Sequence, residues 1–194
     1  IFDKILSKAD ILVENFKPGT LEKWGYGWKE ICKKYPKLIY ASASGFGQTG
    51  PLKELPAYDM VVQGMGGLMS VTGQPNSEPT RVGTSIGDIT AGLFTTIGIN
   101  AALYDRQKTG KGMYIDVSML DCQIAILENA IARYLSKNEI PKPMGSRHPS
   151  IAPFEAFKTR DSHIIIAAGN DKLFEKLCNL LNISELAKDS KFSD

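Results

Sequence analysis

The chain has 194 residues, of which 43% are hydrophobic and 23% are charged, and its formal net charge is +2. A chain of this length buries a substantial core, and its composition excludes the disordered and fibrous classes. The small net charge argues against a nucleic-acid partner, and the lack of an apolar run of ~20 residues argues against a membrane span.

The three cysteines lie far apart at Cys32, Cys122 and Cys178. An odd number of cysteines without a Cys-x-x-Cys pair indicates reduced thiols rather than a disulfide framework. No metal is expected, because no His/Cys/Asp cluster has the spacing of ligands. We expect a cytoplasmic protein, because the sequence shows neither a membrane-spanning run nor a charged start followed by an apolar segment and a small-residue cleavage site. The chain begins at Ile1, inside an expected helix, so we also expect it to be a piece of a longer protein.

The amino-terminal segment predicts a strand–helix–strand unit. DILVE (10–14) is a short β-branched run, WKEICKKYP (28–36) has helical spacing and stops at a proline, and KLIYASA (37–43) is typical of a second buried strand. Such units build parallel sheets with a right-handed crossover, and ligands bind beyond the carboxyl ends of their strands. The loops ENFKPGT (14–20) and SGFGQTGP (44–51) are therefore candidate binding loops.

A glycine-interrupted apolar stretch (58–73) and a polar loop (74–87) precede a long expected helix. Small residues separate its large apolar ones, which indicates close packing against a neighbouring element. Those apolar residues are Ile89, Leu93, Ile97 and Leu103. Basic residues and then Gly110 end the helix.

A strand (113–119) and an amphipathic helix (120–135) follow, and then four prolines fall within residues 136–153. FEAFKT and HIIIAAG are typical of two strands around a turn, with a helix after them. We therefore expect an α/β fold in three parts. They are a Rossmann-like parallel sheet with helices (1–135), a crossing linker (136–153) and the start of a smaller α+β domain (154–194).

Asp88 lies in GTSIGDITAG (83–92), where the polar loop passes into the long helix. An aspartate at a helix start most often accepts backbone N–H bonds as a cap, which is worth about 1 kcal/mol. The surrounding glycines, however, leave room for a ligand to approach, and a helix N-terminus stabilises an anion. From the residues alone, both the helix cap and the reactive group remain open.

Six motifs occur in order: ADILVENFKPGTLEKWG, YPKLIYASASGFGQTGP, YDMVVQGMGGLMSVTG, TSIGDITAG, ALYDRQKTGKGMYIDVSMLD and FEAFKTRDSHIIIAAGNDKLF. Together they resemble the family III CoA-transferases, the group of formyl-CoA transferase and carnitine CoA-transferase, to which the α-methylacyl-CoA racemases are related. Family members are longer, so the chain resembles the middle of one. The resemblance implies two chains interlocked as a homodimer.

The resemblance implies that Asp88 is the catalytic nucleophile. Such an aspartate attacks the carbonyl of an acyl-CoA, expels the CoA thiolate and forms a mixed anhydride, and a small carboxylic acid then takes up the CoA. The ordinary carboxylate pKa of ~3.9 lies far below the ~8.5 of a thiol, so the aspartate is the weaker nucleophile. Remote binding of the CoA nucleotide must offset that difference, and water must be kept from the anhydride.

The resemblance also implies contacts with coenzyme A, the only cofactor we expect. Asn15 and Phe16 match an Asn-Phe pair at the adenosine end of CoA, and Lys23 stands where relatives often have arginine near the phosphates. Asp59 matches an acidic position beside the active site. The ordinary alternatives are a buried core ring for Phe16, a solvated charge for Lys23 and a helix cap for Asp59.

Two glycines in the later part of the chain match loops that border the family's site. Gly145 lies where relatives have a glycine-containing loop over the active site, although here the run is reduced to one glycine. Gly169 belongs to AAGND, which equally suits a strand-to-helix cap.

Two other functions remain open. The racemases exchange an α-proton and carry histidine where this chain has Tyr58, and a tyrosine with a pKa of ~10 is a poor general base near neutral pH. Alternatively, the chain is an inactive fragment that only binds a nucleotide or a partner. The sequence favours a CoA-transferase that acts on an acyl-CoA and a small carboxylic acid, without nucleic-acid or membrane partners.

Overall fold

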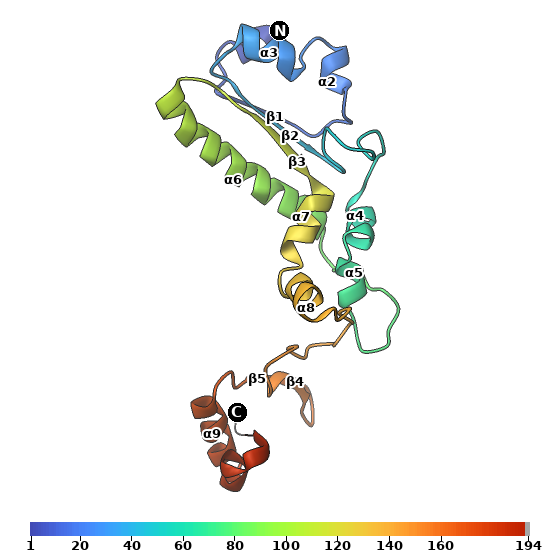
Figure 1. Ribbon diagram of the computed structural model, residues 1–194, viewed down its shortest axis with the longest axis vertical. Coiled ribbons are helices and arrows are strands. Elements are labelled where there is room, and N and C mark those ends of the chain that lie inside the picture. Colours follow the sequence, from blue (N-terminus) through green and yellow to red (C-terminus); the bar gives the residue numbers. More distant parts are fainter. Residues whose placement is uncertain (193–194) are drawn as a thin grey trace. The chain divides into compact units, whose positions relative to one another are not determined.

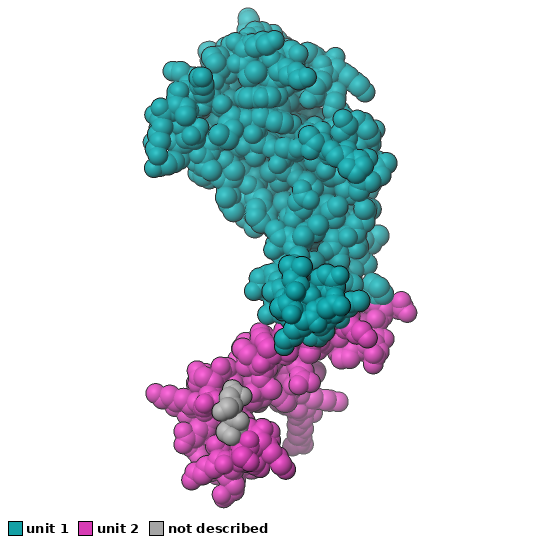
Figure 2. Space-filling view, in the orientation of Figure 1, with its two compact units in different colours: residues 1–72, 79–141 teal, residues 73–78, 142–194 magenta. Residues whose placement is uncertain are grey.

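The computed structural model describes residues 1–192, which belong to two compact units (Figure 2). The first unit comprises residues 1–72 and 79–141. The second comprises residues 73–78 and the chain from residue 142 onward. The chain thus passes into the second unit within the proline-rich stretch 136–153.

A three-stranded parallel sheet forms the centre of the first unit (Figure 1). Its order is β1 (Ile11–Glu14), β2 (Ile39–Ser44), β3 (Tyr114–Ser118). The central strand β2 is buried along almost its whole length, as its apolar sequence predicts. The expected α/β fold with a parallel sheet is confirmed.

Three short helices cover one face of the sheet (Figure 1). They are α1 (Phe2–Leu6), α2 (Thr20–Lys23) and α3 (Trp28–Lys34). Tyr40 of β2 packs there in a buried cluster with Leu6, Leu21, Ile31 and Leu38. Because side chains alternate along a strand, the neighbouring alanines of β2 face the other way.

The long helix α6 (Ile86–Thr109) covers the opposite face, and α4 (Asp59–Met65) and α7 (Met119–Ile126) pack against α6. Helices α5 (Leu68–Val71) and α8 (Asn129–Lys137) follow α4 and α7 along the chain. The long helix α6 packs along β2 and β3 (Figure 1). A buried cluster joins it to α4, α7 and the sheet through Val62, Ala91, Val117 and Met119.

Helix α6 packs through its small residues, not its large ones. Its buried positions are Gly87, Thr90, Ala91, Thr95 and Ala102. By contrast, the side chains of Ile89, Leu93 and Ile97 are 47%, 58% and 62% exposed. The expectation that this helix packs closely is confirmed, and its small side chains make the contact because they bring its backbone nearest to the sheet.

The carboxyl end of α6 is fixed as its sequence predicts. Gly110 adopts φ +69° and donates its N–H to the carbonyl of Arg106 at 2.8 Å. The Arg106 guanidinium in turn donates to the carbonyls of Asp10 and Lys37, at 3.2 and 3.0 Å. These bonds tie the end of α6 to the segments that enter β1 and β2.

Among residues 1–192, α6 is also the one helix long and apolar enough, by length and composition alone, to cross a membrane. The sequence-based expectation that no such run exists is therefore wrong. The criterion is the mean hydropathy of a window, so glycines and threonines between the large apolar residues do not exclude the helix. A core helix of a globular protein meets the same criterion.

The single helix expected over residues 120–135 is two helices. Glu128, with φ +34°, separates α7 from α8. Helix α7 buries Met119, Cys122 and Gln123, whereas α8 buries none of its side chains. The apolar spacing continues across the break, so only the packing of α7 reveals where the first helix stops.

The second unit holds the predicted hairpin and helix. Strands β4 (Phe154–Lys158) and β5 (His163–Ala167) pair antiparallel, and α9 (Asp171–Leu180) follows. The Asn170 side chain caps α9 by accepting the Leu173 N–H at 3.0 Å. Two 3₁₀ turns, η1 (Ser184–Lys188) and η2 (Ser190–Phe192), end the described chain.

Candidate functional site

A cavity of about 1200 Å³ lies in the first unit, at the carboxyl ends of β1 and β2. This edge of a parallel sheet is where open α/β folds bind ligands. The loop after β1, the end of β2, residues 55–60 and the first turns of α6 form its walls. Four of the predicted site residues line it, namely Asn15, Phe16, Asp59 and Asp88.

Asp88 stands in the first turn of α6 but does not cap it. The helix begins after Ser85, and the exposed Asp88 carboxylate makes no hydrogen bond with any described residue. The helix-cap alternative for Asp88 is therefore wrong. Partial burial, and secondly the negative charge of Asp59, raise the pKa of Asp88 above its ordinary value of 3.8.

Asp59 caps α6 instead. Its Oδ1 accepts the N–H of Gly87 at 2.7 Å, and its Oδ2 accepts the side-chain amide of Gln63 at 2.7 Å. Gln63 is fully buried, and its Oε1 accepts the N–H of Val82 at 2.8 Å. A Cβ on Gly87 would lie 2.9 Å from Asp59 Oδ1, so glycine is needed for this close approach. The alternative of a helix cap for Asp59 thus holds, although the helix is α6 rather than α4.

Asn15 and Phe16 form the cavity wall directly after β1. Phe16 is 47% exposed, and its ring meets the edge of Trp24 at 5.6 Å between centroids. The alternative of a buried core ring is therefore wrong. A ring that is held on one edge and open on its remaining surface can stack on a flat ligand.

Two cavity-lining cations were not identified from the sequence. Lys17 follows Phe16 directly, and Arg81 lies in the loop that leads into α6. The Arg81 guanidinium donates to the carbonyls of Val82 and Gly83, at 3.1 and 3.2 Å. In the sequence, only their closeness to Phe16 and Asp88 could have indicated these two cations. The fold shows that both residues line the cavity.

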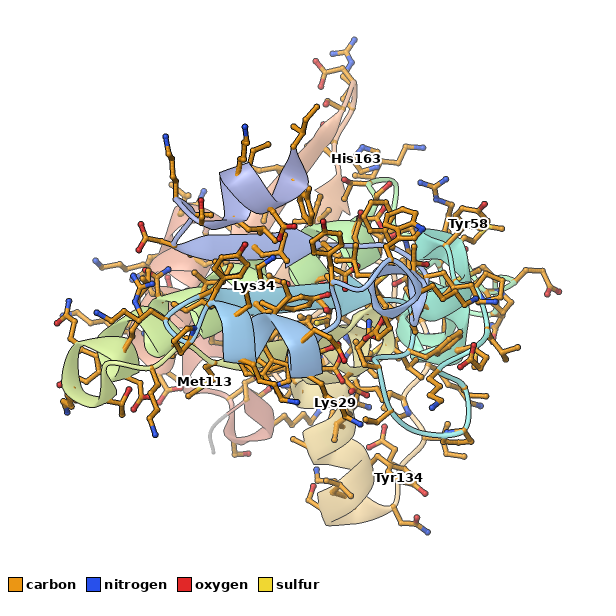
Figure 3. All side chains as sticks on the ribbon, turned by 90° about the horizontal axis from the view of Figure 1, so that it is seen from above. Lys29, Lys34, Tyr58, Met113, Tyr134 and His163 are labelled. Atoms are coloured by element: carbon orange, nitrogen blue, oxygen red, sulfur yellow. The ribbon has the colours of Figure 1, made fainter. Side chains whose placement is uncertain are left out.

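Tyr58 also lines the cavity, beside the start of α4 (Figure 3). Its side chain is 82% exposed. Tyr58, which the resemblance aligns with the histidine of the racemases, is therefore part of the cavity wall.

A further missed residue is Ser44, the last residue of β2. It is only 7% exposed, lines the cavity, and its hydroxyl has no hydrogen-bond partner in the described part of the chain. The sequence does not predict that this hydroxyl is left unpaired, because most buried serine hydroxyls find a partner within the protein.

The remaining predicted residues lie outside the cavity wall. Lys23 is an exposed residue at the end of α2. Gly145, with φ +65°, donates its N–H to the carbonyl of Gly73 at 2.8 Å within the second unit. Gly169 lies between β5 and the Asn170 cap of α9. Their roles in binding CoA stay predictions.

The cavity combines one exposed carboxylate with anionic and cationic neighbours, but it has no cluster of metal ligands. Over residues 1–192, no group of three or more His, Cys, Asp or Glu side chains could hold a metal ion. The charged groups that line the cavity include Asp88, Lys17 and Arg81.

Comparisons with known proteins agree on one family. Residues 1–194 match CoA-transferase family III. The chain is 48% identical, over 99% of its length and 50% of the relative's, to acetyl-CoA:oxalate CoA-transferase of Acetobacter aceti. It is 40% identical, over 98% of its length and 48% of the relative's, to succinate–glutarate CoA-transferase of Agrobacterium fabrum.

A solved structure has the same fold. A CAIB/BAIF family protein from Brucella suis is 44% identical and superposes with a TM-score of 0.84, over 98% of this chain and 50% of that one. The chain therefore spans about half the length of the relatives that it matches.

Proposed function

Since the chain belongs to CoA-transferase family III, we propose that it forms the part of a CoA-transferase that binds the acyl-CoA and supplies the nucleophile Asp88. The observation that carries this proposal is the contrast between two acids of one cavity. Asp59 is held by two hydrogen bonds, whereas Asp88 is exposed, unpaired among the described residues and raised in pKa. A carboxylate with a raised pKa is a better nucleophile than an ordinary one.

In the proposed reaction, an oxygen of ionised Asp88 attacks the thioester carbonyl carbon, the C–S bond breaks, and CoA leaves as the thiolate. The product is a mixed anhydride. The thiolate then attacks the aspartyl carbonyl, which releases the donor acid and leaves an aspartyl thioester. The acceptor carboxylate repeats these two steps in reverse order and departs as its own CoA thioester, so Asp88 returns to its ionised form.

The remote end of CoA would bind at the loop after β1. Phe16 offers an exposed ring for the adenine, and stacking of a base on an aromatic ring contributes about 1–3 kcal/mol. Asn15 offers a polar amide, and Lys17 offers a charge to the phosphates. This binding would hold the thioester near Asp88 and offset the weakness of a carboxylate nucleophile.

The acceptor would be a small dicarboxylic acid. The two relatives are named for oxalate, and for succinate and glutarate, all of which keep a second carboxylate when one carboxyl is activated. Arg81 lines the cavity and is the cation suited to that second carboxylate, because guanidinium can bind it with two hydrogen bonds. The homodimer and the cytoplasmic location stay predictions.

The test is to incubate the full-length protein with acetyl-, oxalyl-, succinyl- and glutaryl-CoA, quench with hydroxylamine and analyse the peptides by mass spectrometry. We expect a hydroxamate on Asp88, and none in the Asp88→Asn variant. Asp121→Asn, an exposed acid of α7 that does not line this cavity, is the matched control and should react like the wild type. Exchange of an α-proton without any adduct would instead indicate a racemase.

A further inference from the structure

Gln63 of α4 is a fully buried polar residue whose side-chain amide is paired at both ends. Its Oε1 accepts the N–H of Val82 at 2.8 Å, and its Nε2 donates to Oδ2 of Asp59 at 2.7 Å. A carboxylate can only accept and a backbone N–H can only donate, so these two partners fix the orientation of the amide. The position needs a donor and an acceptor on one neutral side chain, which glutamine supplies.

The same side chain ties an irregular loop to α4. Residues 81–84 belong to no helix or strand and lead directly into α6. Two hydrogen bonds join this loop to α4, and both end on Gln63. One is the bond from the Val82 N–H, and the other is a longer bond, at 3.5 Å, from Nε2 to the carbonyl of Thr84. Gln63 therefore holds the loop against α4.

Arg81, which lines the cavity, is oriented by this loop. Its Nε donates to the carbonyl of Val82 at 3.1 Å, and its Nη2 donates to the carbonyl of Gly83 at 3.2 Å. Val82 thus accepts from Arg81 through its carbonyl and donates to Gln63 through its N–H. Further N–H groups of the guanidinium remain for a ligand, because the group carries more donors than these two bonds use.

We propose that Gln63 is a positioning residue for the acceptor acid. Through Val82, it holds the Arg81 guanidinium in the place where it binds the second carboxylate of a dicarboxylic acid. This inference rests on the proposed function. Gln63 itself touches no substrate, because it is fully buried and does not line the cavity. The carboxylate that Arg81 binds does not react, so its binding distinguishes dicarboxylic from monocarboxylic acceptors.

The test measures the acceptor selectivity of the full-length protein. Selectivity is kcat/KM for the best acceptor among oxalate, succinate and glutarate, divided by kcat/KM for the monocarboxylic acid with the same number of carbons. Gln63→Met introduces an unbranched side chain of similar size and removes both hydrogen bonds, so selectivity should fall about three- to tenfold. Any effect that reaches Asp88 through Asp59 acts on both acids alike and cancels in this ratio.

A double-mutant cycle shows whether Gln63 acts through Arg81. Arg81→Met should lower the selectivity at least as much as Gln63→Met does. Adding Gln63→Met to Arg81→Met should lower it no further, because the guanidinium that Gln63 positions is then absent.

Gln123→Met is the matched control. Gln123 is also fully buried, its Nε2 donates to the Thr90 hydroxyl of α6 at 3.0 Å, and it does not line the cavity. This variant should lose thermal stability, as Gln63→Met does, but it should keep the wild-type selectivity.

A second variant serves if Gln63→Met does not fold. Replacing Val82 by its α-hydroxy acid puts an ester oxygen in place of the N–H. The change breaks the bond to Gln63 from the side of the loop and leaves the bond between Gln63 and Asp59 intact. Selectivity should fall as it does for Gln63→Met.

Wild-type selectivity in Gln63→Met or in the ester variant would overturn the positioning role. A further loss in the double variant, or an equal loss in Gln123→Met, would overturn it as well. If the wild-type protein uses the two kinds of acid equally well, the role of Arg81 fails, and if it transfers CoA to none of them, the proposed function fails. The role of Gln63 then fails too, but these wild-type results are distinct from unchanged selectivity in the variants.

Discussion

Two aspartates near the first turn of α6, Asp59 of α4 and Asp88 of α6 itself, differ in their hydrogen bonds. Asp59 accepts from Gly87 and Gln63 and so belongs to the scaffold. Asp88 has no such bond among the described residues. Partial burial, and secondly the negative charge of Asp59, raises the pKa of Asp88.

The pH dependence of acyl-enzyme formation should follow Asp88. Only its ionised form attacks, so the rate should fall as the pH drops through its pKa. Because burial and then the Asp59 charge raise that pKa above 3.8, the acid limb should lie above pH 3.8. Hydroxamate formation measured across the acidic range gives the limb.

The same measurement on Asp59→Asn is the control for the cause of the shift. The limb should move to lower pH, but not all the way to the ordinary value, because burial is the larger cause and remains. A limb in the same place as in the wild type would show that the charge of Asp59 does not act on Asp88.

Removing the Asp59 carboxylate should destabilise the fold. Asp59→Ala leaves α6 without its cap and the buried amide of Gln63 without its closest acceptor, so the free energy of unfolding should fall by about 1–3 kcal/mol. Urea denaturation measures the change. The exposed loop residue Glu54 supplies a control, since Glu54→Ala should change stability by less than about 0.5 kcal/mol. Equal stability of the two variants would contradict the capping role.

At the scale of the element, α6 has one close-packed face and one open face, and two of its glycines distinguish them. A Cβ on Gly98 would lie 2.9 Å from Cγ2 of Ile115 on β3, whereas a Cβ on Gly92 would meet nothing within 4 Å. The helix thus approaches the sheet too closely for a side chain at one glycine but not at the other.

Alanine substitutions of these glycines should have opposite effects on stability. Gly92→Ala should raise the free energy of unfolding by about 1 kcal/mol, because alanine is the better helix former. Gly98→Ala gains the same propensity but forces β3 and α6 apart, so it should be about 1–3 kcal/mol less stable than Gly92→Ala. Thermal unfolding of both variants checks this, and equal melting temperatures would contradict the close packing of α6.

At the scale of the whole molecule, the first unit exposes a row of large apolar side chains on α6. Ile89, Leu93 and Ile97 are spaced four residues apart and are each about half exposed or more. Contiguous apolar surface of this kind favours association. The row lies on the helix that also carries Asp88, so anything that covers it would lie close to the cavity.

The 194-residue chain should therefore bind a hydrophobic dye through this row. Replacing Leu93 and Ile97 together by glutamine should lower the dye fluorescence and the tendency to associate, while the circular dichroism stays unchanged because both side chains point away from the sheet. Ile165→Gln on β5, an exposed isoleucine of the second unit, is the comparison. Unchanged fluorescence in the double variant would show that the row is covered in solution.

Much of the fold could be predicted from local patterns. The apolar runs of β1, β2 and β3, the stop of α6 at Gly110 and the hairpin of β4 and β5 all depend on neighbouring residues, so periodicity and turn chemistry reveal them. The motifs likewise indicated Asn15, Phe16, Asp59 and Asp88, which the structure places in one cavity.

Other features depend on contacts between residues distant in sequence, and no local pattern contains them. Asp59 caps α6 by accepting the N–H of Gly87, which lies 28 residues later in the chain. Glu128 interrupts a continuous apolar pattern where α7, which buries three of its residues, gives way to α8, which buries none. Ser44 is unusual only because no partner reaches its hydroxyl. The spacing of apolar and polar residues decides which secondary structure a segment forms. A side chain's burial, its hydrogen-bond partners and the lack of a partner are decided only when distant segments pack together.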